Sequence, residues 1–348
     1  MKKNLQLLEI QDIEEIIEQA PKDFVRAQVL CSIEKNQDEL PLWGICVGTE
    51  AKSAPTVVIV GGVHGLERIG SHVVIAYLKS ITERLKWSIS LQNQLKQIRI
   101  IFVPVVNPMG MHLGARSNGN GVDLMRNAPI ESKEAPLFFG GQNWTSRLPY
   151  FRGFGYLEKE LIKLEEYIIE NTFKSKAVLL LDVHSGFGVT DRIWFPYARE
   201  SNPFPHWLEI YKWVENFEEA FPNHPYIFEP QSVSYCTHGD FWDYLYDRFY
   251  GDSLRKKNVF IPITLEMGSW LWLKKNPKQF FSFLGAFNPI KPHRKRRVLR
   301  RHVAFLDYLK DAVESHSAWT QVDEKKRMVL KDQAQRRWYP DKKLLFRS

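Results

Sequence analysis

Short apolar runs that end in glycines and polar residues constrain the fold of this chain more than any other feature. The run from Thr56 to Val60 is β-branched and apolar, and it leads into Gly61-Gly62-Val63-His64-Gly65-Leu66-Glu67. A continuous apolar run of this length is typical of a buried strand, and the small residues after it let the backbone turn sharply. The pattern therefore places His64 and Glu67 at the carboxyl end of a strand, where ligands of open α/β sheets collect.

Strand and helix patterns alternate along most of the chain. Strands are predicted near residues 43–48, 56–61, 100–106, 177–182, 192–196 and 259–265, and helices near 67–84, 156–171, 203–220, 239–249 and 299–315. This alternation predicts an α/β fold with a mixed, largely parallel central sheet flanked by helices. Residues 127–155 form the longest irregular stretch, and a loop of that length is usually a wall or lid of a functional site.

The domain organisation follows from the ends of the alternating region. Residues 1–40 are predicted to form an N-terminal helical flank, because isoleucines recur at helical spacing before Pro21. Residues 41–318 are predicted to be one α/β domain, and residues 319–348 a charged C-terminal arm. A chain of 348 residues is long enough to bury a substantial core in such a domain.

Composition narrows the possible partners and the compartment. The net charge of +8 favours acidic partners or substrates. Such a basic excess is common in enzymes that bind no nucleic acid, so we do not expect a nucleic acid among the partners. The three cysteines, Cys31, Cys46 and Cys236, support neither a disulfide framework nor a cysteine zinc site. Acidic residues interrupt the N-terminal stretch and no run reaches the length of a membrane span, so we expect a cytoplasmic protein without membrane partners.

A second strand end supplies another histidine. The apolar run Ala177 to Leu181 continues into Asp182-Val183-His184-Ser185-Gly186. Two histidines and one glutamate make the three protein ligands of a catalytic zinc, whose fourth position is left for water. Taken singly, His64 and His184 also fit structural histidines, and Glu67 also fits a first-turn acid of a helix.

A further series of motifs after the first histidine and glutamate extends the site. After the apolar strand Ile100 to Val106 come Asn107-Pro108-Met109-Gly110, then Arg116, then Gly121-Val122-Asp123-Leu124-Met125-Arg126-Asn127. With H-x-x-E before them, a strand-end histidine after them and a late glutamate, the segment from about residue 43 to 270 resembles the zinc carboxypeptidase superfamily, including its cytosolic branch. The resemblance implies a zinc carboxypeptidase-like, phosphorylase/hydrolase-type sandwich and a hydrolase.

The resemblance also implies a role for each matching residue. His64, Glu67 and His184 are similar to the ligands of one Zn²⁺ per chain, and Glu266, at the end of an apolar strand, to the general base. Arg116 is similar to the arginine that polarises the scissile carbonyl. The substrate-binding residues are expected to be Arg126, which suits a terminal carboxylate, Asn127, and Tyr235. Tyr235 is expected to close over the substrate and so to be catalytic as well.

Two departures keep other functions open. Met125 stands where the family often has asparagine, and Leu66 where digestive members often have arginine. A zinc-dependent N-acyl amino acid deacylase, similar to succinylglutamate desuccinylase or aspartoacylase, therefore stays an alternative to a metallocarboxypeptidase. A non-catalytic peptide-binding module is a third. The substrate expected in the first two cases is a peptide or acyl amino acid with a free carboxylate, and the basic balance suits an acidic one.

One basic run has no role in this scheme. Lys291-Pro292-His293-Arg294-Lys295-Arg296-Arg297, with Arg300 and Arg301, is the strongest basic cluster of the chain. Such a run is usually a solvated helix start, and it also fits a patch for an anionic polymer or an acidic peptide.

Overall fold

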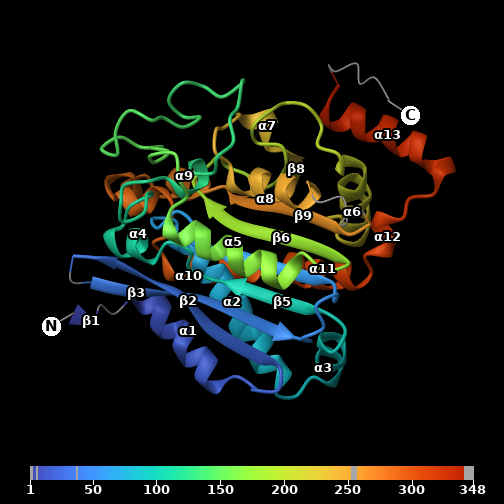
Figure 1. The fold of residues 1–348 in the computed structure, drawn as a ribbon, viewed down its shortest axis with the longest axis horizontal. Coiled ribbons are helices and arrows are strands. Elements are labelled where there is room, and N and C mark those ends of the chain that lie inside the picture. Colours follow the sequence, from blue (N-terminus) through green and yellow to red (C-terminus); the bar gives the residue numbers. More distant parts are fainter. Residues whose placement is uncertain (1–2, 5–6, 37, 252–256, 341–348) are drawn as a thin grey trace.

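The computed structural model describes residues 3–4, 7–36, 38–251 and 257–340. Its centre is one sheet, which contains nine strands in these ranges (Figure 1). The strands are β1 (Lys3–Asn4), β2 (Val25–Lys35), β3 (Asp38–Gly48), β4 (Thr56–Gly61), β5 (Arg99–Val103), β6 (Ala177–Ser185), β7 (Arg192–Phe195), β8 (Ile227–Pro230) and β9 (Val259–Met267).

The order of the strands is β1-β3-β5-β4-β6-β9-β7-β8, with β2 paired to β3 outside this path. The central strands β5, β4, β6 and β9 run parallel, while β2, β3 and β7 make antiparallel pairs. This confirms the predicted mixed, largely parallel sheet. Because the central strands are parallel, their carboxyl ends meet at one edge of the sheet.

Helices cover both faces of the sheet. They are α1 (Leu8–Gln19), α2 (Arg68–Leu85), α3 (Ile89–Leu95), α4 (Pro108–Leu113), α5 (Lys159–Thr172), α6 (Trp207–Ala220), α7 (Gln231–Ser234), α8 (Phe241–Tyr250), α9 (Trp270–Lys275), α10 (Pro292–Arg301), α11 (Val303–Glu314), α12 (Ser317–Thr320) and α13 (Glu324–Trp338), with short 3₁₀ turns η1 (Leu124–Arg126), η3 (Pro277–Phe281) and η4 (Phe283–Ala286). None of the helices in the described residues has the length and apolarity needed to cross a membrane.

The alternation of side chains along β6 separates two hydrophobic cores. Leu179, Leu181 and Val183 pack in the larger core with residues of α2, α6 and α11, while Val178 and Leu180 pack in the second core with α5 and α8. Successive side chains of a strand point to opposite faces, so Asp182 and His184 share the face of Leu180. The polar end of β6 thus lies on the side covered by α5 and α8.

The structure differs from the prediction at the amino end. The predicted helical flank holds α1, but residues 25–35 form β2, which pairs with β3 along most of its length. The flank is therefore not purely helical, because pairing with a neighbouring strand outweighs the weak local pattern. Residues 1–2, 5–6 and 37 of the predicted flank lie outside the described residues.

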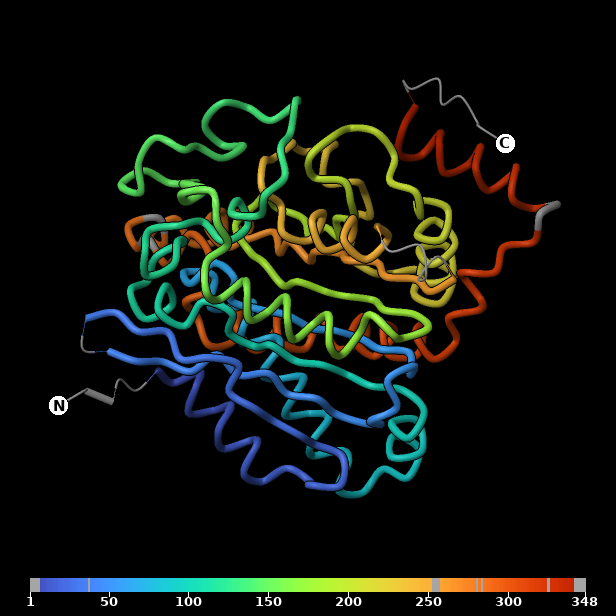
Figure 2. Tube along the Cα trace, in the orientation of Figure 1, coloured from blue at the N-terminus to red at the C-terminus, as the bar shows by residue number. Residues whose placement is uncertain are grey.

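The predicted C-terminal arm begins within α12 and contains α13, and both helices lie beside α6 (Figure 2). Trp338, at the end of α13, is buried, and its ring lies 4.6 Å from that of Phe195 of β7. The arm is therefore anchored to the sheet rather than extended into solvent. Residues 341–348 of the predicted arm lie outside the described residues.

Candidate metal and catalytic site

Glycines shape the turn that follows β4. Gly62 has a φ of +65°, and a Cβ atom on Gly65 would lie 2.1 Å from the backbone of Gly110. A side chain at either place would strain or displace the backbone. The sharp turn carries His64 over the end of the sheet and places Glu67 directly before α2.

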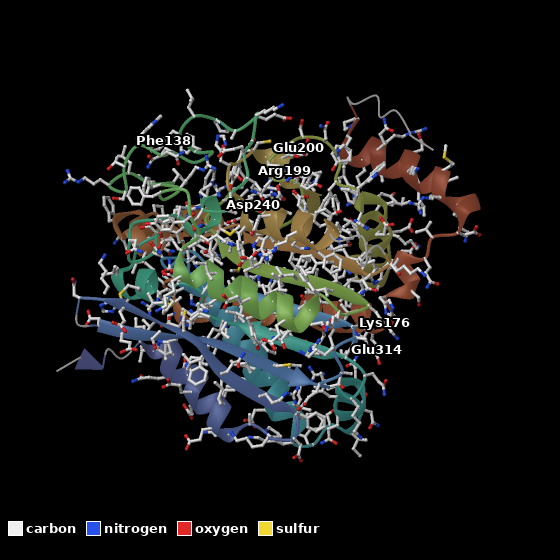
Figure 3. All side chains as sticks on the ribbon, viewed as in Figure 1. Phe138, Lys176, Arg199, Glu200, Asp240 and Glu314 are labelled. Atoms are coloured by element: carbon white, nitrogen blue, oxygen red, sulfur yellow. The ribbon has the colours of Figure 1, made fainter. Side chains whose placement is uncertain are left out.

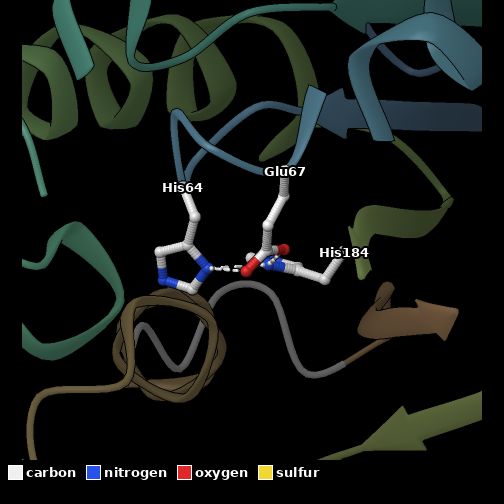
Figure 4. Close-up of side chains that lie close together, drawn as sticks. All are labelled: His64, Glu67 and His184. Carbon is white, nitrogen blue, oxygen red and sulfur yellow. Dashed lines mark hydrogen bonds and ion pairs between the residues drawn. The ribbon is translucent and has the colours of Figure 1, made fainter. Parts of the chain in front are cut away.

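His64, Glu67 and His184 converge at the carboxyl ends of β4 and β6 (Figure 4). Their potential ligand atoms lie within 4.8 Å of one another, and all three side chains are buried. His64 Nδ1 is 2.9 Å from Glu67 Oε1, and His184 Nδ1 is 3.1 Å from Glu67 Oε2. The structure thus brings together the three residues predicted as metal ligands.

The outer nitrogens of the two imidazoles explain why this arrangement fits a cation. His64 Nε2 lies 3.1 Å from Asp123 Oδ1, and His184 Nε2 lies 2.6 Å from Asp182 Oδ2. Each carboxylate accepts the Nε2 hydrogen, so a neutral ring directs its Nδ1 lone pair inward. The two Nδ1 atoms are 3.2 Å apart, a distance at which facing lone pairs repel unless a proton or metal ion lies between them.

The electrostatics of the cluster also favour positive charge. Burial opposes ionisation of Glu67, but its contacts with His64 and His184 outweigh this and hold its pKa below the usual value. Burial disfavours the His184 cation, but Asp182 and Glu67 raise the pKa of His184 above the usual value. The residues therefore fit the donor set of a zinc site, two imidazoles and a carboxylate.

Glu266 lies beside this cluster on the neighbouring strand. It is the register partner of His184 in the parallel pair β6–β9, and its side chain is 8% exposed. Burial, and secondly the charge of Glu67, raise the pKa of Glu266 to about 8. One carboxylate oxygen accepts a hydrogen bond from the backbone N–H of Phe187 at 3.0 Å, which fixes the side chain at the site.

Arg116 reaches the cluster from the segment after α4. Its Nε donates to Asp123 Oδ2 at 2.8 Å, and its Nη1 lies 3.5 Å from Glu67 Oε1. Burial opposes the charge, but Asp123 and Glu67 more than offset it and raise the pKa of Arg116. Asp123 thereby holds both a predicted metal ligand and a predicted catalytic arginine.

Arg126 is a buried cation in the same cavity. Its side chain donates to the carbonyl of Met125, and its guanidinium carbon lies 6.0 Å from the centre of the Tyr235 ring. Among the described residues no carboxylate forms an ion pair with Arg126, and its buried Nε has no hydrogen-bond partner. A buried cation that no carboxylate contacts as an ion pair is costly, so this guanidinium is suited to an anionic ligand.

Tyr235 and Asn127 have different positions. Tyr235 follows α7 and lines the cavity, where its ring packs 5.9 Å from Phe187 and 5.8 Å from Trp194. The Asn127 amide instead donates to the carbonyls of Arg152 and Tyr156 and accepts from the N–H of Glu158. Asn127 is absent from the cavity lining and ties down the loop that carries Arg126.

One cavity of about 600 Å³ is lined by the three predicted ligands and by Glu266, Arg116, Arg126 and Tyr235. The irregular segment 127–155, green in Figure 1, supplies Phe139 and Tyr150 to its wall. Phe138, labelled in Figure 3, packs edge-on against both rings. The segment is thus a wall of the site, as its length predicts. Among residues 240–243, Asp240 lines the cavity, and it also caps the amino end of α8.

Two features of the site lack a local signal in the sequence. Trp270 and Phe287 line the cavity from the segment after β9, and Trp242 of α8 donates its indole N–H to Asp182 at 2.7 Å. Each depends on how distant segments pack. For the bond between Trp242 and Asp182, the sequence indicates only the acceptor, an aspartate two residues before a strand-end histidine.

Comparisons with known proteins agree with the geometry. Residues 13–267 match the sequence model of the family described as zinc carboxypeptidase. Carboxypeptidase SOL1 of Arabidopsis thaliana is 30% identical over 120 residues, a match that covers 32% of this chain and 24% of that protein. The chain thus matches about a quarter of the length of this relative.

Solved structures share the fold. Thrombin-activatable fibrinolysis inhibitor superposes with a TM-score of 0.64 at 21% identity, over 87% of this chain and 72% of that chain. Carboxypeptidase A from Helicoverpa armigera gives a TM-score of 0.61 at 19% identity, over 92% and 75% of the two chains. At this identity the likeness shows the fold alone.

Proposed function

This chain belongs to the zinc carboxypeptidase family, and from that premise we propose that it is a zinc-dependent metallocarboxypeptidase. Its substrate is a peptide with a free C-terminal carboxylate, and its reaction is hydrolysis of the last peptide bond. One Zn²⁺ per chain would be held by His64, Glu67 and His184. When bound, zinc supplies a Lewis acid that activates water at neutral pH.

The observation that carries the proposal is the cation Arg126. It is buried in the same cavity as the three ligands, and no described carboxylate pairs with it. A terminal carboxylate would supply the missing anion in the two-pronged geometry that a guanidinium prefers. An internal peptide bond has no free carboxylate next to it, so an enzyme that cleaved such bonds would not use this charge.

The remaining residues divide the chemistry of amide hydrolysis. Glu266 accepts a proton from the attacking water and passes it to the leaving amine. A cation in the ligand set would counter the Glu67 charge and so lower the pKa of Glu266, which favours the ionised base. Arg116 donates hydrogen bonds to the scissile carbonyl oxygen as negative charge develops there. Tyr235 covers the bound end of the substrate.

The test is a mass-spectrometric cleavage screen of the zinc-loaded protein. The substrates are matched peptides with free or amidated C-termini and N-acyl amino acids, and Glu266→Gln is the inactive control. Loss of single residues from free-ended peptides alone is the expected result. Release of acyl groups with peptides untouched would assign the chain to the deacylases. Peptide binding without cleavage of any substrate would make it a binding module.

A further inference from the structure

The basic excess of the chain is confined to one segment beside the cavity. Residues 268–306, here called the acid-free segment, contain ten of the 48 Lys and Arg residues and none of the 40 Asp and Glu residues. The rest of the chain therefore has 38 cations and 40 anions and is nearly balanced. A charge imbalance so localised points to a function of this segment rather than to a general property such as solubility.

The cations of α10 form an outward face. His293, Arg296, Arg297 and Arg300 are exposed and follow one another at helical spacing, while Val298 is buried. Residues at positions i, i+3, i+4 and i+7 lie on one side of a helix. Arg296, Arg297 and Arg300 thus make the solvent face of α10 strongly basic.

The end of α9 continues this face toward the cavity. The guanidinium of Arg294 on α10 donates to the carbonyls of Trp272 and Lys275, both at 3.3 Å. This contact places Lys274 and Lys275 next to the start of α10, and Lys278 follows in η3; all three lysines are exposed. α9 itself begins at Trp270, which lines the cavity.

Few of these charges are neutralised within the protein. Arg301 pairs with Asp191 at 2.8 Å. For Lys274, Lys275, Lys278, Arg296 and Arg297 the described residues include no carboxylate within ion-pair distance. Like charges this close repel one another, and an external anion would relieve the repulsion.

The geometry of the cavity indicates which part of a substrate meets this surface. Trp270 donates its indole N–H to the carbonyl of Gly186, and Ser185 donates its hydroxyl to the carbonyl of Phe287. These contacts put Trp270 and Phe287 beside the β6 end that carries His184. Arg126, in contrast, lies next to Gly239 and Tyr235.

A substrate whose carboxylate binds Arg126 and whose last peptide bond lies at the three ligands therefore continues past Trp270 and Phe287. We propose that the acid-free segment binds acidic residues of the substrate upstream of the cleaved bond. This inference rests on the proposed carboxypeptidase function and names its substrate class, a peptide with an acidic tract before its C-terminal residue. Exposed ion pairs of this kind raise affinity and association rate and weaken with salt.

The experiment compares two peptides with the same C-terminal dipeptide. One carries alternating glutamate and glycine upstream, and the other carries glutamine in place of each glutamate. Each exposed ion pair contributes a factor of about 1.5 to 5, so three pairs should lower KM for the acidic peptide about tenfold at low salt. kcat should be equal for both, and the difference in KM should shrink to about twofold near 0.5 M salt.

Two triple variants of equal charge separate a local effect from a general one. Lys274→Gln, Lys275→Gln and Lys278→Gln should remove most of the preference for the acidic peptide and leave cleavage of the neutral peptide unchanged. The control is Lys96→Gln, Lys174→Gln and Lys176→Gln, exposed lysines next to the amino ends of β5 and β6. Figure 3 shows Lys176 at the end of the molecule away from Asp240. The control triple should keep the preference.

Equal KM values for the two peptides at low salt would overturn the inference, as would equal loss of the preference in both triples. Binding of a fluorescent acidic peptide to zinc-loaded Glu266→Gln gives an independent measurement. If no peptide is cleaved but this binding is lost only in the triple variant of Lys274, Lys275 and Lys278, the acidic-peptide surface is supported and the carboxypeptidase function is refuted. Tighter binding of RNA or of anionic vesicles than of the acidic peptide would assign the surface to those partners instead.

Discussion

Substitution of Asp182 by asparagine tests whether the charge behind His184, a proposed metal ligand, sets the metal affinity. Asp182 Oδ2 accepts from His184 Nε2 at 2.6 Å and from the Trp242 indole N–H at 2.7 Å, and the residue is fully buried. The amide oxygen of asparagine can occupy the same position and keep both bonds. The substitution therefore removes the negative charge and changes the shape of the site very little.

The expected loss is a 10- to 100-fold weaker affinity for zinc, which is about 1.4 to 2.7 kcal/mol. The carboxylate makes the His184 ring a stronger donor, and a neutral amide does so less. Asp182 does not line the cavity, so kcat per zinc-loaded molecule should stay close to the wild-type value. The effect should appear in the zinc concentration needed for half-maximal activity.

Zinc affinity is measured by competition with a chromophoric chelator, and folding of each metal-free variant is checked by thermal unfolding. Asp243→Asn is the matched control, because Asp243 is equally buried but accepts from the backbone of Ala198 and Arg199 rather than from a ligand. An affinity of Asp182→Asn within twofold of wild type would refute the reasoning. An equal loss in the control would show that any buried charge change has this effect.

Three further outcomes are expected. Arg116→Ala should lower kcat about 100- to 1000-fold, the usual effect of losing an oxyanion donor, while zinc content by metal analysis stays stoichiometric; a loss of zinc instead would assign Arg116 to the metal site. Arg126→Leu should raise KM for free-ended peptides toward that for amidated ones, and an unchanged KM would contradict its carboxylate role. Burial raises the pKa of Glu9, but hydrogen bonds from His72 and Arg68 outweigh burial and lower that pKa to about 2. The ionised Glu9 therefore stabilises the fold fully above pH 4.5, and this stabilisation is lost as the pH falls toward 2. Glu9→Gln should therefore cost up to about 3 kcal/mol near neutral pH and little near pH 2, and a difference in unfolding free energy that did not vary with pH would contradict this origin.

The residues of the cluster could be predicted because each lies at the end of an apolar run. His64, His184 and Glu266 follow or close strands that the sequence marks clearly, and parallel strands bring their carboxyl ends to one edge. A local pattern was therefore sufficient to identify residues that are 82 or more positions apart in the sequence. The glycines after β4 likewise predicted the sharp turn that carries His64.

Contacts that depend on packing could not be predicted in this way. The direction of the Asn127 amide, toward the backbone of Arg152 and Tyr156, is set by how the long loop folds back. β2 carries no strong alternation and forms because β3 offers it a paired edge. The bond from Trp242 to Asp182 requires α8 to dock on β6, which adjacent residues do not encode.

Strand register links the distant core to the chemistry. His184 and Glu266 are direct partners in the β6–β9 pair, and Asp182 and Thr264 are partners two residues earlier on the same face. A slip of β9 by one residue would turn Glu266 to the opposite face of the sheet, because side chains alternate. The register is held by the fully buried residues Leu180 and Phe260, which pack against α5 and α8. The hydrophobic core thus positions Glu266 and His184, the proposed base and a proposed metal ligand, next to each other at the edge of the cavity.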